Sequence, residues 1–288
     1  MMETIVSSQN QATIARPVRL CGISANDFRD CVAEIRPAPA NHGIVFRTPQ
    51  GPVRACIANL CRQERHHTTS LRNGEAHVRT VEHLLSALYG LGIDNAAIEL
   101  KRCGIPFRDF SADWFCRLIV HAGVRELPER RRLAKITERE TFFGPGGETA
   151  ILSPTPHDRL TVECHIDFPD PIGKATVRYD SGDGNYADAV APARSFMSSP
   201  LADGDSDKWE RVRSIYPILP EDPSESPLIT YTEGRFLTPL RFPNEPATHK
   251  LLDFLGDISL LGLRLAGRVE VYRPGHRFTA ETVARMAP

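Results

Sequence analysis

The sequence lacks the features that define several classes of protein. No apolar run approaches the roughly 20 residues that a membrane-spanning helix needs. The N-terminus has no basic region followed by an apolar core, so we expect no secretory signal. The formal net charge of −1 creates no positive field that would attract nucleic acid. We therefore expect a cytoplasmic protein with no nucleic-acid partner and at most peripheral membrane contact.

Paired cysteine motifs are also missing. The seven cysteines are odd in number, scattered and without C-x-x-C spacing. Cys56 and Cys61 have poor spacing for a zinc knuckle, so we expect reduced, mostly buried thiols. A short basic run at residues 130–132 is typical of a solvated linker.

Two segments of this otherwise ordinary globular chain resemble each other. The chain has 288 residues, 41% hydrophobic and 25% charged, which allows two domains or one large one. Residues 80–92 and 248–262 each indicate a helix that ends at glycine, and a strand follows each of them. Because the pattern occurs only twice, it predicts two related halves and not a solenoid.

The first of these helices has clear end signals. Thr80 is placed to be its N-cap, and Gly90 and Gly92 are placed to stop it. Its apolar positions recur at the spacing of one helix face: Val81, Leu84, Leu85 and Leu88.

Strand signals surround both helices and predict an α+β fold with helices layered on a sheet face. They fall at residues 32–36, 43–47, 53–58, 149–153 and 160–168. We expect a linker at 126–132. A Pro-, Asp-, Ser- and Glu-rich stretch at 200–246 predicts a long surface excursion.

The spacing of His249 and Asp253 indicates a metal site. Residues four apart share one helix face, so an imidazole and a carboxylate can form two adjacent arms of a zinc site. His83 in the first helix offers a third arm. Adjacent helical residues diverge by about 100°, which leaves Glu82 free to act as a general base. Three protein ligands with an open position are typical of catalytic zinc, although iron(II) accepts the same ligands.

Other interpretations of these histidines remain open from spacing alone. Ten histidines produce such a spacing by chance, so His249 could simply pair with a carboxylate on a solvated face. His83 could be a satisfied, partly buried histidine. The neighbouring pair His66 and His67 is typical of a solvated loop.

His276 follows a predicted strand and a Pro-Gly turn, a position from which a side chain can reach a site. Its pKa lies near neutrality, so it could protonate a leaving amine. Asp257, one turn beyond Asp253, could hold that imidazole in its charged form. The alternative is an ordinary loop histidine.

These motifs together resemble the UDP-3-O-acyl-N-acetylglucosamine deacetylases, enzymes of the committed step of lipid A synthesis. The similarity runs in order through about residues 10 to 285. It is carried by residues 80–88, 92–95, 249–257 and 275–276, with further likeness at 36–41, 105–109 and 193–196.

The resemblance implies roles for the site residues. Glu82 would be the base that takes a proton from the attacking water, and His276, supported by Asp257, would be the acid that protonates the departing nitrogen. The ligands of Zn²⁺ would be His83, His249 and Asp253.

It also implies substrate contacts and a fold. Lys250 would place positive charge near the developing oxyanion or the substrate. Ser195 replaces the family's threonine and keeps its hydroxyl, which helps to stabilise the oxyanion. Phe196 would lie against the sugar. The fold would be two similar layered α/β-sandwich domains, residues 1–130 and 131–288, packed face to face with the active site between them.

Three stretches depart from the family pattern, at residues 16–24, 108–111 and 197–246. They alter the surroundings of the substrate and leave three hypotheses. The first is a zinc-dependent amidase that removes acetate from a UDP-linked acylated glucosamine. The second is a divergent paralogue acting on another N-acetyl amino sugar. The third is a non-catalytic member that binds a nucleotide sugar or a protein partner.

Overall fold

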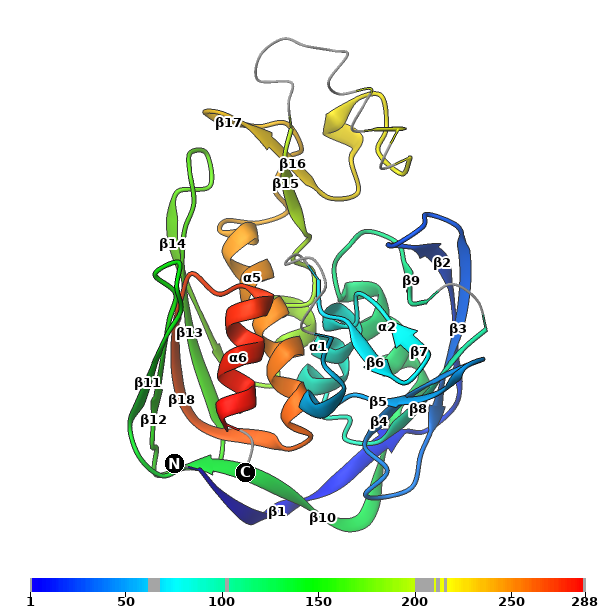
Figure 1. The fold of residues 1–288 in the computed structure, drawn as a ribbon, viewed down its shortest axis with the longest axis vertical. Helices are drawn as coiled ribbons and strands as arrows, with labels where there is room; N and C mark the ends of the chain where they lie inside the picture. Colours follow the sequence, from blue (N-terminus) through cyan, green and yellow to red (C-terminus); the bar gives the residue numbers. More distant parts are fainter. Residues whose placement is uncertain are drawn as a thin grey trace.

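Two large sheets enclose a layer of helices in the computed structural model (Figure 1). The structure describes residues 2–61, 68–101, 104–199, 210, 213–214 and 217–286. Strands and helices segregate into separate layers, so the predicted α+β class is confirmed.

The first sheet has six strands, and residues 18 to 107 supply all of them. Its strands are antiparallel except for the parallel pair β4 and β8. The strand order is β5 (Gly51–Arg54), β4 (Ile44–Thr48), β8 (Ala96–Leu100), β3 (Asp30–Pro37), β2 (Val18–Ser24) and β9 (Pro106–Phe107). Alternating burial along β3 turns one face of this sheet to the helices.

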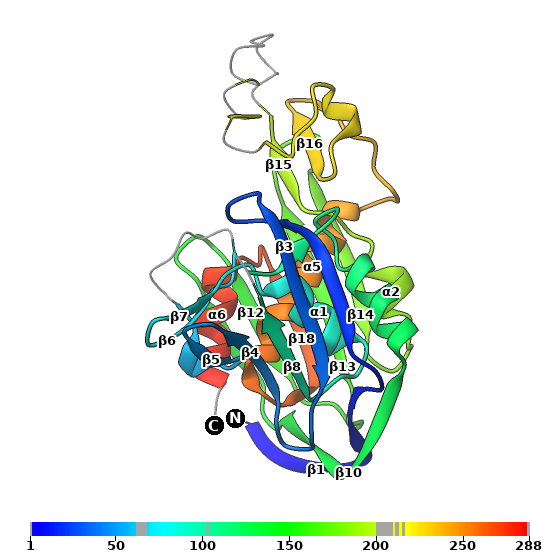
Figure 2. The same cartoon turned by 90° about the vertical axis from the view of Figure 1, so that its right-hand side faces the viewer.

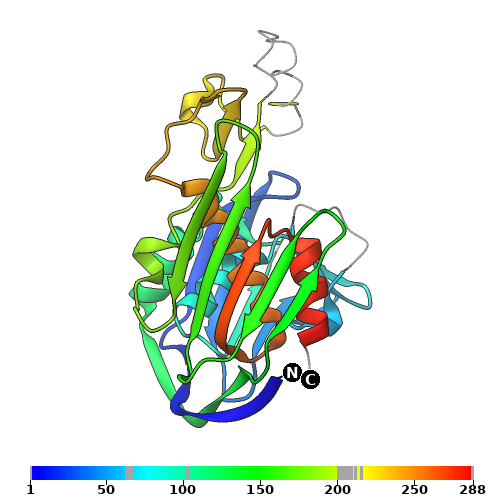
Figure 3. The same cartoon turned by 90° about the vertical axis from the view of Figure 1, so that its left-hand side faces the viewer.

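The second sheet has seven strands and is centred on β18 (Arg264–Tyr272), which pairs with three neighbours. Figure 3 shows this sheet from its outer side, with the helices behind it. The other strands are β1 (Met2–Ile14), β10 (Val124–Ile136), β11 (Glu140–Phe143), β12 (Thr149–Ser153), β13 (Leu160–Asp167) and β14 (Lys174–Asp180).

Four helices fill the space between the sheets. Helices α1 (Glu82–Gly90) and α2 (Asp113–Ala122) lie on the side of the six-stranded sheet, while α5 (Glu245–Ile258) and α6 (His276–Met286) lie on the side of the seven-stranded sheet (Figure 1). A short helix, α3 (Tyr186–Ala189), also packs against α1 and α2. A single hydrophobic cluster runs through both halves of the chain.

The crossing of α1 and α5 is unusually close. A Cβ atom added at Gly256 would lie 2.2 Å from the backbone oxygen of Glu82, so only glycine fits there. The hydroxyl of Ser86 donates to the carbonyl of Leu252 at 2.7 Å and links the helices again. These contacts hold the first half of α1 against residues 252–256 of α5.

The end signals of α1 were only partly correct. The helix ends at Gly90, as predicted, but its N-cap is Val81. Thr80 has a φ of 55° and uses its hydroxyl to bond Asn26 instead. The helix is also buried on all sides from Glu82 to Tyr89, because a sheet covers one side and α5 the other. Its polar side chains therefore need partners inside the protein.

Of the two predictions for the connecting segments, one was wrong. Residues 126–132 are not a linker but part of β10, which pairs with β1 and exposes most of its charged side chains. The stretch 200–246 does extend away from the large sheets, as predicted, and it also holds β16 (Ile229–Thr232) and β17 (Arg235–Phe236). With β15 (Phe196–Ser198) they form a small sheet that extends beyond the large ones (Figure 2).

Several shorter segments also differ from the sequence predictions or add to them. The predicted strand at 53–58 ends at Arg54 and continues into a 3₁₀ turn, Ile57–Asn59. A small hairpin, β6 (Leu71–Asn73) and β7 (Ala76–Val78), precedes α1. No disulfide bond joins any two of the six described cysteines, and only three of the six are buried. None of the described helices combines the length and the apolar character needed to cross a membrane.

Candidate metal centre and active site

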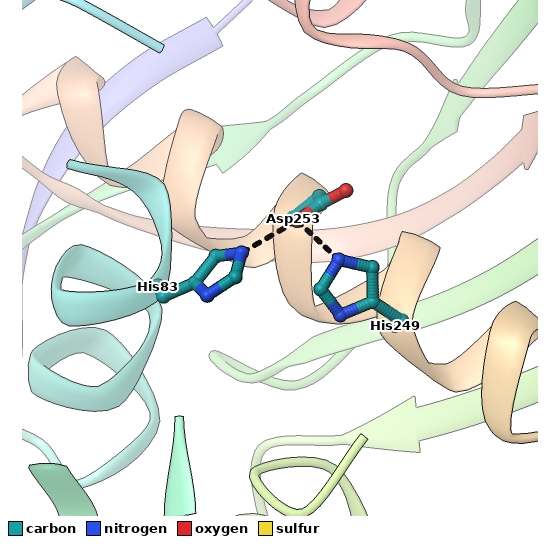
Figure 4. Close-up of side chains that lie close together, drawn as sticks. All are labelled: His83, His249 and Asp253. Atoms are coloured by element: carbon teal, nitrogen blue, oxygen red, sulfur yellow. Dashed lines mark ion pairs between the residues drawn. The ribbon is translucent and has the colours of Figure 1, made fainter. Parts of the chain in front are cut away.

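Helix α5 presents three polar residues along one face, and α1 faces them with its first turn. His249, Asp253 and Asp257 are spaced four apart, so their side chains follow one line along α5. His83 on α1 points across the helix crossing toward His249 and Asp253 (Figure 4). The close approach at Gly256 is what makes this meeting of two distant segments possible.

The structure brings the three expected ligands to one point. One oxygen of Asp253, Oδ1, lies 3.6 Å from Nε2 of His83 and 3.3 Å from Nε2 of His249. All three ligand atoms lie within 4.8 Å of one another, and all three residues are buried. Sequence spacing predicted the pair on α5, whereas the third member comes from a segment about 170 residues away.

The protonation states of these residues leave lone pairs facing one another. The Nδ1–H of His249 donates to the carbonyl of Ala193 at 3.1 Å, which leaves Nε2 as an acceptor. Burial lowers the pKa of His83 to about 3 and also lowers the pKa of His249, so both imidazoles are neutral. Burial opposes ionisation of Asp253, but its basic neighbours outweigh burial and lower its pKa. Two neutral imidazole nitrogens and a carboxylate oxygen therefore converge.

These donors fit a divalent cation. Oδ1 of Asp253 and Nδ1 of His83 are buried without a hydrogen-bond partner among the described residues. Buried polar atoms normally have partners, and a cation between the three ligand atoms would satisfy the carboxylate oxygen. Two imidazoles and one carboxylate suit zinc(II) and iron(II) equally.

Beside these ligands lie a carboxyl group and a histidine–aspartate pair. Glu82 is 2% exposed, and burial raises its pKa to about 7. Nδ1 of His276 lies 2.9 Å from Oδ2 of Asp257. Burial disfavours the charged imidazole, but the nearby carboxylates, Asp257 first and then Asp253, outweigh burial and raise the pKa of His276 to about 9. Nε2 of His276 lies 3.6 Å from Asp253, so the pair adjoins the ligands.

Thr69 connects the carboxyl group to the pair, and sequence reasoning missed it. Its backbone N–H donates to Oε2 of Glu82 at 2.9 Å. Its hydroxyl donates to Oδ1 of Asp257 at 2.5 Å and lies 3.1 Å from Nδ1 of His276. Thr69 precedes the small hairpin and is separated from these two partners by 188 and 207 residues. No spacing along the chain could have linked them.

The remaining predicted site residues also adjoin the ligands. Nζ of Lys250 donates to Oδ2 of Asp253 at 2.7 Å, so its charge is directed at that carboxylate. Oγ of Ser195 lies 3.1 Å from Nε2 of His249. The ring of Phe196 lies 6.1 Å from that imidazole. His66 and His67 lie outside the described residues.

A buried ion pair fixes the segment that carries Ser195 and Phe196. Arg194 donates to both oxygens of Glu245 at 2.8 and 3.1 Å, and Glu245 is fully buried at the start of α5. Charged groups are seldom buried unless they are paired in this way. The pair therefore holds the segment to the beginning of the ligand helix.

Comparison with known proteins identifies the family. The family model described as UDP-3-O-acyl N-acetylglycosamine deacetylase matches residues 11–287. The chain belongs to this family. Its members are deacetylases, which hydrolyse an amide bond, and the assignment made from the sequence motifs is confirmed.

Curated relatives agree over nearly the whole chain. A protein of Myxococcus xanthus (strain DK1622), named UDP-3-O-acyl-N-acetylglucosamine deacetylase, is 35% identical, and the match covers 97% of this chain and 87% of the relative. Proteins of the same name from Legionella pneumophila (strain Corby) and Pseudomonas entomophila (strain L48) are 34% and 32% identical. Those matches cover 92% and 96% of this chain and 86% and 89% of the relatives.

Proposed function

We propose that the protein is a zinc-dependent deacetylase that removes the N-acetyl group from UDP-3-O-acyl-N-acetylglucosamine in lipid A biosynthesis. The observation that carries this proposal is the convergence of His83, His249 and Asp253 beside the Glu82 carboxyl group and the His276–Asp257 pair. A nucleotide-sugar substrate would place the reaction in the cytoplasm. Iron(II) is the alternative metal, because it accepts the same donors.

His83, His249 and Asp253 would hold the cation, which supplies Lewis acidity for activating water and polarising the acetyl carbonyl. Glu82 takes the proton from the attacking water. A carboxylate whose pKa is raised toward neutrality is suited to that role. The N–H of Thr69 occupies Oε2 of Glu82, leaving Oε1 to accept the proton.

His276 completes the reaction by protonating the amine. Its Nδ1–H is engaged by Asp257, so Nε2–H is the proton that can be donated to the leaving nitrogen. The water oxygen bonds to the acetyl carbon and the C–N bond breaks. The products are acetate and a free amine. Thr69 and Asp257 act as positioning residues, because each works through His276 or Glu82.

Three further residues would serve the substrate. We assign the hydroxyl of Ser195 to stabilising the oxyanion that develops at the acetyl carbonyl. Lys250 contributes positive charge through its contact with Asp253. Phe196 lies against the sugar, since its ring adjoins His249 and offers an apolar surface.

An acetate-release assay tests this function. The purified protein should release acetate from UDP-3-O-acyl-N-acetylglucosamine, and N-acetyl amino sugars without the nucleotide or the acyl chain should react far more slowly. Glu82→Gln should lose most activity, on the order of 100-fold or more, because general-base catalysis contributes 10²–10⁴-fold.

The same assay separates the other hypotheses. Faster release from a different N-acetyl amino sugar would support a divergent paralogue, the hypothesis that the departures at 16–24, 108–111 and 197–246 suggest. Metal-loaded protein that releases acetate from none of these compounds would contradict the proposed activity and favour a non-catalytic member. The retained set of ligands, base and acid argues against that last outcome.

A further inference from the structure

A cavity of about 170 Å³ with a mixed apolar and charged lining lies near the C-terminal end of α1, apart from the candidate metal centre. Leu85, Leu88 and Tyr89 of α1 line it, together with residues from both sheets. Tyr89 lies six residues beyond His83, which is about 9 Å along the helix axis. None of the residues assigned to catalysis, metal binding or substrate contact lines this cavity.

The lining of the cavity is strongly basic. It contains four arginines and a single carboxylate, an excess of three positive charges (four minus one), although the whole chain has a net charge of −1. The charged members are Arg54, Arg131, Arg132, Arg264 and Asp94.

The one carboxylate is already shared between two arginines. Arg131 donates to Asp94 through Nε at 3.0 and 3.1 Å and through Nη2 at 2.8 Å, while Arg264 donates through Nε at 3.0 Å. The two guanidinium side chains are only 12% and 17% exposed. One carboxylate cannot neutralise two largely buried cations, so positive charge remains in the wall.

The other two arginines have no ion pair with any residue in the described ranges. Arg54 comes from β5 of the six-stranded sheet, and Arg132 comes from β10 of the seven-stranded sheet. Both are exposed. Because they come from different sheets, a ligand held by both would bridge the two halves of the molecule.

The neutral part of the wall is fixed in shape. Nδ2 of Asn95 donates to Gln11 at 3.0 Å, and Nε2 of Gln11 donates to Asn41 at 2.9 Å. The N–H of Gly43 donates to Oδ1 of Asn95 at 2.8 Å. These bonds hold Gln11 and Asn95 to neighbouring residues, so we look to the arginines of the wall for ligand selection.

We propose that this cavity binds a compact phosphate-type anion, inorganic phosphate or pyrophosphate. Guanidinium groups recognise phosphate oxygens through paired, charge-assisted hydrogen bonds. The volume is far above the roughly 10–15 Å³ that one water needs, and it is below the 300–1,000 Å³ of typical drug-sized pockets. A small multiply charged anion matches both the size and the excess charge.

Calorimetric titration tests the proposal with phosphate and pyrophosphate as separate probes, at constant ionic strength and on the metal-loaded protein. The wild type should bind one anion per chain saturably. The double variant Arg54→Gln/Arg132→Gln should bind at least about tenfold more weakly, because two charge-assisted hydrogen bonds are lost. Its thermal unfolding midpoint without the anion should match that of the wild type.

A second double variant controls for overall charge. Arg19→Gln/Arg139→Gln removes the same charge from exposed positions away from the cavity and should bind as the wild type does. Equal weakening in both double variants would overturn the proposal, as would unchanged binding in Arg54→Gln/Arg132→Gln or the absence of saturable binding. Pyrophosphate binding that is lost with Asp253→Ala, and not with the arginine variant, would assign the anion to the metal instead.

Discussion

At the scale of single residues, the site depends on hydrogen bonds between segments that are far apart in the chain. The i, i+4 spacing predicted that His249, Asp253 and Asp257 share a helix face, because helical geometry alone determines that relation. Spacing could not reveal Thr69, whose partners come from α1, α5 and α6. Its part in the site depends entirely on the tertiary fold.

Thr69→Val should lower kcat by about 10- to 100-fold with little change in KM. The valine keeps the backbone N–H that holds Glu82 but loses the hydroxyl that holds Asp257, a bond to a charged group worth about 1.5–3 kcal/mol. Steady-state kinetics measure the effect. Thr69→Ser is the matched control and should keep most of the activity, and equal loss in both variants would contradict a role for the hydroxyl.

Asp257→Asn should move the alkaline limb of the kcat/KM profile to lower pH. His276 acts as an acid only while protonated, so activity falls as the pH rises through its pKa. The charge of Asp257 raises the pKa of His276, and removing that charge brings the fall to lower pH. A pH profile of the variant that keeps the wild-type limb would show that Asp257 does not support this imidazole.

At the scale of elements, the essential contact is the crossing of α1 and α5. The sequence predicted both helices and the strands that follow them, because apolar periodicity and glycine stops are local signals. It did not predict that α1 is buried on every side, since that follows from what packs around it. It also missed the helix that begins at His276, because it placed that residue only after a strand and a Pro-Gly turn.

Gly256→Ala should separate the two helices. The added methyl group would lie 2.2 Å from a backbone oxygen, which cannot move as a flexible side chain can. We expect a loss of about 1–3 kcal/mol in the free energy of unfolding, together with weaker metal binding, because His83 would be displaced from His249. Urea unfolding and metal titration measure the two effects.

Gly275→Ala provides the comparison, because a Cβ atom at that position meets nothing within 4 Å. It should unfold as the wild type does. A Gly256→Ala variant with unchanged stability and metal affinity would contradict the tight contact between the two helices.

At the scale of the whole molecule, the α+β class was predictable because strands and helices each have their own periodicity. The long pair β1 and β10 was not predicted, since charged side chains obscure the apolar alternation of strands. The pairing adds the N-terminal strand to the sheet of the second half. The division of the chain into two domains at residue 130 stays a prediction. Residue 130 lies inside β10, and one hydrophobic cluster contains residues from both sides of it.

The central claim is that residues from both halves hold one cation, and metal content measures this most directly. Elemental analysis should find about one zinc or iron per wild-type chain. Single substitutions of His83, His249 or Asp253 by alanine should each remove most of the metal, while Glu82→Gln should retain it with little activity. Full metal content in the alanine variants, or acetate release by metal-free wild-type protein, would contradict the account.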